Sequence, residues 1–92
     1  MAVRVSIPTA LRQYAGGHNA ITVEGGTVGE ALQALTAQHP ELGMQLMHNG
    51  DLRNFVNVYL NDDDVRYLQG METPIGARDE ISIIPAIAGG TA

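Results

Sequence analysis

The sequence predicts a small α+β domain in which one mixed sheet of four to five strands packs on one main helix. Three observations support this fold class. Residues 2–7 and 21–24 alternate apolar and polar side chains, as half-buried strands do. Residues 28–38 repeat apolar side chains at helical spacing. Residues 81–86 form a nearly continuous apolar run, which is typical of a central strand.

The first two strands are expected to form a hairpin. Val3, Val5 and Ile7 share one face of the first strand, and Pro8 ends its pairing because proline cannot donate to a ladder. A short connector follows. The sequence Gly-Gly-His-Asn at 16–19 then supplies residues that tolerate positive φ, and it predicts the turn into the second strand.

The main helix carries clear start and stop signals. Thr27 is a good N-cap, and Glu30 three residues later completes a capping box. The helical spacing continues to about Gln38, and Pro40 prevents further continuation. Residues 42–47 are expected to form a short irregular or one-turn helical piece.

The second half of the chain reads as three further strands. Residues 55–60 predict a third strand, 61–64 a turn, 65–68 a short fourth strand, and 71–76 a loop before the last strand. The first and last strands are both apolar and are expected to be neighbours in the middle of the sheet. This order of elements is that of a β-grasp, the ubiquitin-like architecture.

We expect two parts in the chain: a β-grasp body over residues 1–86 and a flexible C-terminal tail over 87–92. The tail contains Gly89-Gly90 and then Thr91-Ala92. The other two glycine pairs, at 16–17 and 25–26, are interpreted as turns. The last pair differs because no later element remains for it to turn toward. A Gly-Gly tip is the thinnest backbone available, and it suits entry into a narrow channel.

Composition excludes several functions. The formal charge of −5 argues against binding to a nucleic-acid backbone. No apolar run approaches the roughly 20 residues that cross a bilayer, and no leader pattern opens the chain. We therefore expect no membrane association and a cytoplasmic location. The chain has no cysteine, and all five basic residues are arginines, so it offers neither a thiol nor an ε-amine for chemistry.

The segments VSIPTALRQYAGG at 5–17, NDDDVRYL at 61–68 and ARDEISIIPAIAGG at 77–90 resemble the ubiquitin-like sulfur-carrier proteins. That family includes the small carriers of thiamine and molybdopterin synthesis. The opening segment and FVNVYLNDDDVRYL at 55–68 look closest to the carrier of thiocarboxylate-dependent cysteine synthesis. The resemblance covers essentially the whole chain.

The resemblance implies a carrier that is not an enzyme and binds no cofactor itself. A partner activating enzyme would use ATP to adenylate the carboxylate of Gly90, and sulfur would then replace an oxygen to give a thiocarboxylate. A cysteine-synthase-like or other sulfur-accepting enzyme would consume it. Gly89, Ala88 and Ile87 would present Gly90 to these partners.

Thr91-Ala92 departs from the usual pattern because Gly90 then has no free carboxylate. By resemblance, a zinc-dependent metallopeptidase is expected to cut between Gly90 and Thr91. Without that cut the chain would be inactive as a carrier.

The family uses the exposed sheet face beside the tail to contact partners. The candidates in this chain are the apolar residues Phe55, Tyr59, Leu60, Ile84 and Ile87. Periodicity alone cannot separate them from the core, and it favours the core for Phe55 and one face of the last strand. The three histidines lack ligand spacing, so no metal site is expected.

Two other classes of function remain open at this point. The chain could be a ubiquitin-like modifier joined through Gly90 to lysines of other proteins. It could also be a β-grasp interaction domain whose tail has no chemical role.

Overall fold

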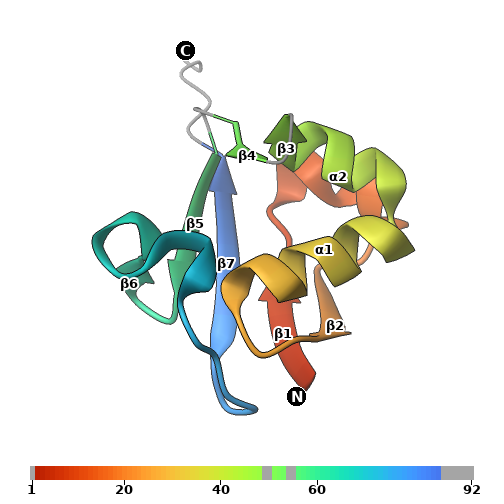
Figure 1. Cartoon of the computed structure of the whole chain (residues 1–92). Helices are drawn as coiled ribbons and strands as arrows, with labels where there is room; N and C mark the ends of the chain where they lie inside the picture. The colour runs from red at the N-terminus through yellow and green to blue at the C-terminus, as the bar shows by residue number, and fades with distance from the viewer. Residues whose placement is uncertain (1, 49–50, 54–55, 86–92) are drawn as a thin grey trace.

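In the computed structural model, which describes residues 2–48, 51–53 and 56–85, one sheet packs against helices on one of its faces (Figure 1). The elements in chain order are β1 (Ala2–Ser6), the 3-10 helix η1 (Thr9–Ala15), β2 (Ala20–Glu24), α1 (Val28–Gln38), α2 (Pro40–Leu46), β3 (Met47–His48), β4 (Asp51–Leu52), β5 (Val56–Leu60), β6 (Asp63–Asp64), the 3-10 helices η2 (Val65–Tyr67) and η3 (Gly70–Glu72), and β7 (Glu80–Pro85).

The sheet has the strand order β2-β1-β7-β5-β6. β1 and β7 are parallel neighbours, with Val5 opposite Ile81, and every other pairing in this sheet is antiparallel. The first and last strands therefore lie side by side at the centre, as the sequence predicts, and the β-grasp fold is confirmed. A separate two-stranded ladder joins β3 and β4.

The core lies between the sheet and the helices because each central strand turns alternate residues inward. Val3, Val5, Ile81 and Ile83 are buried on this face of β1 and β7. The buried side of α1 meets them with the apolar residues that the helical spacing singled out: Val28, Ala31, Leu32 and Leu35.

The capping box at the start of α1 forms with one difference. The Glu30 backbone N–H donates to Thr27 Oγ1 at 3.2 Å, as expected. The Glu30 carboxylate accepts instead from the Gly26 backbone N–H at 2.7 Å, one residue before the N-cap. Both contacts satisfy donors at the helix start, so the local role is the one that the sequence indicates.

The structure corrects two predicted elements. The expected short piece at 42–47 is part of the helix α2, which Pro40 opens because proline at the first helical position loses no hydrogen bond there, and Met47 already belongs to β3. The expected short strand at 65–68 is wrong. Asp63–Asp64 forms the short strand β6, and Val65–Tyr67 is a 3-10 turn capped by the Asp64 side chain, which accepts from the Arg66 N–H at 2.9 Å.

Candidate functional site

The candidate site begins where β7 ends. Pro85 is the last described residue, and it lies opposite Val56 of β5. At the other end of this ladder the Asn61 N–H donates to the Glu80 carbonyl at 2.8 Å, so that pair is hydrogen-bonded. Directly opposed residues in an antiparallel ladder alternate between hydrogen-bonded and non-hydrogen-bonded pairs. Val56 lies five positions before Asn61 on β5, so the Pro85–Val56 pair is non-hydrogen-bonded. Proline can occupy this position without costing the ladder a hydrogen bond.

The polar backbone groups of Val56 point away from β7 and find partners on the outer side of β5. The Val56 N–H donates to the Arg53 carbonyl at 3.0 Å. The Val56 carbonyl accepts from Nη2 of Arg66 at 2.7 Å. The end of β5 is therefore held in place beside the end of β7.

The face of the sheet opposite the core is open near this point. Ile84 is 46% exposed there and lies opposite Asn57, while half-buried Tyr59 lies opposite Ser82. We call Ile84, Asn57 and Tyr59 the tail-side face. Ile84 is therefore an exposed apolar side chain on the open sheet face, one residue before the last described residue.

Leu60 does not belong to that face, contrary to the expectation from sequence. Val56, Val58 and Leu60 alternate inward along β5, and Leu60 is only 9% exposed within the core. Periodicity places every second residue of β5 on one face, and Tyr59 takes the other. Phe55 lies outside the described residues.

The tail itself also lies outside the described residues. This applies to the presenting residues Ile87, Ala88 and Gly89, to Gly90, to the expected cut before Thr91, and to the boundary between 86 and 87. Their roles remain predictions. Among the described residues, no group of three or more acidic or histidine side chains could hold a metal ion. No helix in that same part of the chain is long and apolar enough to cross a membrane.

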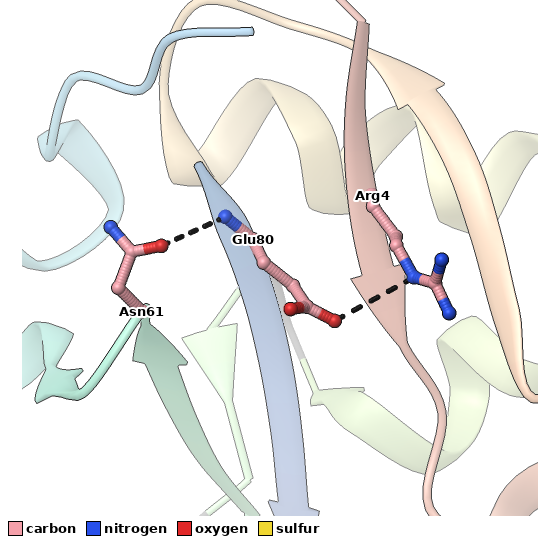
Figure 2. A network of polar contacts seen from close by, with 3 residues as sticks. All are labelled: Arg4, Asn61 and Glu80. Carbon is pink, nitrogen blue, oxygen red and sulfur yellow. Dashed lines mark hydrogen bonds and ion pairs between the residues drawn. The ribbon is translucent and has the colours of Figure 1, made fainter. Parts of the chain in front are cut away.

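The opposite end of β7 is polar and structural (Figure 2). Glu80 forms an ion pair with Arg4 across β1 and β7, with 3.6 Å between Nε and Oε2. The Glu80 N–H also donates to Oδ1 of Asn61 at 3.1 Å. These contacts lie at the start of β7, so the pair contributes to the sheet rather than to the candidate site.

Asp79 completes this polar end. Its carboxylate accepts from the Gly76 backbone N–H at 2.8 Å and from Nδ2 of Asn61 at 3.2 Å. The Gly76 hydrogen bond, and then the Asn61 hydrogen bond, lower the pKa of Asp79 because both favour its charged form. Asn61 adopts a left-handed conformation with φ of 57°, which places its amide between Asp79 and Glu80.

Arg66 and Asn57 are the site residues that sequence reasoning missed. The sequence pattern indicates a strand at Arg66, yet Arg66 lies in the 3-10 turn η2, and its guanidinium donates to Oδ1 of Asn57. A usable signal was present in the sequence. Asp64 is a good cap residue, and its presence directly before Val65 favours a short helical turn over a strand.

A five-stranded mixed sheet with parallel central strands β1 and β7, packed on α1, defines the chain as a ubiquitin-like β-grasp protein. The family comparison assigns the chain within this class: residues 5–90 match the ThiS family, and the chain belongs to that family of ubiquitin-like sulfur carriers.

Individual relatives agree with this assignment. The sulfur carrier protein CysO of Mycobacterium tuberculosis is 42% identical over 93 aligned positions, which cover 98% of this chain and 100% of the relative. The structure of the Amycolatopsis orientalis BexX/CysO complex contains a chain with 40% identity and a TM-score of 0.88, covering 96% of this chain and 99% of that one. Small archaeal modifier protein 1 from Methanosarcina acetivorans has 31% identity and a TM-score of 0.86, covering 97% and 96%.

Proposed function

We propose that this protein is a sulfur carrier whose Gly90 carboxylate, once free, is converted to a thiocarboxylate. The observation that carries the proposal is the family match, which runs through residue 90 and leaves Thr91-Ala92 beyond it. Relatives of nearly the same length carry the name sulfur carrier protein. The protein would act as a substrate of partner enzymes and not as an enzyme itself.

The chemistry requires two steps at Gly90. A carboxylate oxygen attacks the α-phosphorus of ATP on the activating enzyme, and pyrophosphate leaves. A hydrosulfide equivalent then attacks the acyl carbon, AMP leaves, and the terminus becomes a thiocarboxylate with no net oxidation or reduction. This carrier has no cysteine or lysine, so none of its side chains offers a thiol or amine to intercept the activated acyl group.

The destination of the sulfur is proposed to be cysteine or a related sulfur metabolite, through a cysteine-synthase-like acceptor enzyme. The identity to a CysO carrier supports this choice. The solved BexX/CysO complex supports the idea that such carriers dock on a separate protein. We propose the tail-side face as the contact surface and a zinc-dependent metallopeptidase as the enzyme that removes Thr91-Ala92.

The test uses protein that ends at Gly90, incubated with the activating enzyme, ATP and sulfide. The intact mass should shift by the exchange of one oxygen for one sulfur, and omission of ATP should abolish the shift. No such exchange under conditions in which the same enzyme activates a known carrier would contradict the proposal.

A second candidate function is protein modification. The similarity to small archaeal modifier protein 1 favours it specifically, because that relative matches this fold over nearly its full length. In that case Gly90 would form an isopeptide bond with lysines of target proteins. Immunoblots should then show conjugates of higher mass that disappear when Gly90 is deleted, whereas a pure carrier should show none.

A further inference from the structure

The outer edge of β5 presents two neighbouring exposed side chains, Arg66 and Tyr67, from the short helix η2. Val65 before them is 1% exposed and anchors η2 in the core. Tyr67 is 87% exposed, more than any other described large apolar residue. Figure 1 shows β6, which leads into η2, on the side of β5 that faces away from β7. A fixed turn thus carries an aromatic side chain almost entirely in solvent.

The guanidinium of Arg66 is held in one orientation. Its Nη2 donates to the Val56 carbonyl at 2.7 Å and to Oδ1 of Asn57 at 2.5 Å. The Arg66 backbone is fixed in turn by the Asp64 cap. Because both bonds use Nη2, Nε and Nη1 have no partner within the described part of the chain, and three N–H donors stay available.

The guanidinium of Arg66 also forms no ion pair within the described residues. The ion pair that the structure places within the described residues joins Arg4 to Glu80, at the far end of β7. Arg66 instead binds a carbonyl and an amide oxygen, which are neutral. A planar, pre-oriented guanidinium with free donors matches a carboxylate well, and its prior orientation reduces the entropy lost on binding.

This pair is continuous with the tail-side face. Asn57, which accepts from Arg66, lies opposite Ile84 in the ladder. Only the side chain of Asn57 therefore separates Arg66 from a partner that covers Ile84. Tyr and Arg, together with Trp, are enriched among the residues that contribute most of the binding energy at protein interfaces.

We infer that Arg66 and Tyr67 extend the docking surface around the β5 edge, and that the activating enzyme meets them with a carboxylate beside an apolar pocket. This inference rests on the proposed function, because it takes the enzyme that receives Gly90 as the partner. According to this inference, part of the affinity of the carrier for the activating enzyme comes from a surface that is separate from the tail.

The experiment measures KM and kcat of ATP-dependent activation for carriers ending at Gly90. Tyr67→Ala is the decisive variant, because a side chain so exposed contributes little to folding. We expect KM to rise about fivefold to thirtyfold with kcat unchanged, as for an interface residue of this type. Met44→Ala is the matched control, since Met44 is 66% exposed on α2, and it should leave KM unchanged.

Arg66 is tested by a charge series. Arg66→Gln should raise KM and weaken its dependence on salt, whereas Arg66→Lys should retain much of the salt dependence. Arg78→Gln removes an exposed arginine before the start of β7, and it should leave KM unchanged. Thermal unfolding of each variant separates loss of binding from loss of fold.

The outcomes are distinguishable. A Tyr67→Ala carrier that is activated with the parent KM overturns the inference and leaves the proposed function intact. An equal rise in KM for Met44→Ala also overturns it, because the effect would not be specific to the β5 edge. A parent carrier that the enzyme never activates contradicts the proposed function itself.

Discussion

Pro85 lies opposite Val56 on a rung of the β5–β7 ladder that carries no hydrogen bond between the two residues. A proline can therefore end β7 without loss of pairing, while Arg53 and Arg66 bind the outward-facing groups of Val56. The two strands are held together up to the last described residue. The chain beyond Pro85 starts from a fixed point beside the tail-side face.

A pair of substitutions tests this rung. Pro85→Ala should change the free energy of unfolding by no more than about 1 kcal/mol, because no ladder bond is gained or lost. Ile84→Pro should destabilise by about 1–3 kcal/mol or more, since Ile84 and Asn57 form a bonded pair. Urea denaturation measures both values. Equal effects of the two substitutions would show that the assigned alternation is wrong.

Gly43 of α2 lies very close to Thr36 of α1. A Cβ added at Gly43 of α2 would lie 2.3 Å from Cγ2 and 2.7 Å from Oγ1 of Thr36 on α1. Gly43→Ala should therefore destabilise the protein by about 1–3 kcal/mol through overpacking. The penalty should be smaller in a Thr36→Ala background, which removes the two nearest atoms. A double-mutant cycle measures this coupling, and strictly additive effects would contradict the predicted clash.

The lowered pKa of Asp79 predicts that the free energy of unfolding depends on pH in the acid range. Its folded pKa lies below the usual value, so the unfolded chain binds more protons near pH 4 and the free energy of unfolding rises with pH there. The contribution of Asp79 is complete above its unfolded pKa and is lost as the pH falls through its folded pKa. NMR titration should give a depressed pKa that moves upward in Asn61→Gly, which removes one hydrogen bond but keeps a residue suited to positive φ. An unchanged pKa in that variant would exclude Asn61 as a cause.

A polar substitution of Ile84 should impair activation of the carrier while leaving its folding stability nearly unchanged. Ile84→Ser should alter the free energy of unfolding by about 1 kcal/mol or less, because roughly half of the side chain is already in solvent. It should raise the KM for activation, since the tail-side face would lose its exposed apolar contact. Thr22→Ala on edge strand β2 is the control and should leave KM unchanged. An Ile84→Ser carrier with the parent KM would remove Ile84 from the docking surface.

The sequence predicted the fold well where local and long-range signals agree. The alternation of Val3 and Val5, the cap at Thr27 and the apolar last strand each specify a local element that also suits the sheet. The central, neighbouring positions of β1 and β7 were predicted because both strands are apolar, and the structure adds that the two strands are parallel. Consistency between levels makes such predictions reliable.

The features that the sequence did not predict depend on tertiary contacts, which hydrophobic periodicity does not reveal. Val65 through Leu68 reads equally well as a strand, and only the Asp64 cap and the burial of Val65 make it a turn. The sequence does not show which face of β5 is buried, and the structure shows that Leu60 faces the core and Tyr59 the opposite side. Arg66 reaches Val56 across ten positions in the sequence, a distance at which no local pattern predicts a hydrogen bond.

The sulfur content of the C-terminal peptide tests the central claim most directly. The carrier ending at Gly90 and the chain ending at Ala92 should be incubated in parallel with the activating enzyme, ATP and sulfide, digested, and analysed by mass spectrometry. We predict sulfur on Gly90 in the shorter protein and none in the longer one until Thr91-Ala92 is removed. Sulfur on the intact longer chain, or on any residue other than Gly90, would contradict a thiocarboxylate carrier that acts through its freed terminal glycine.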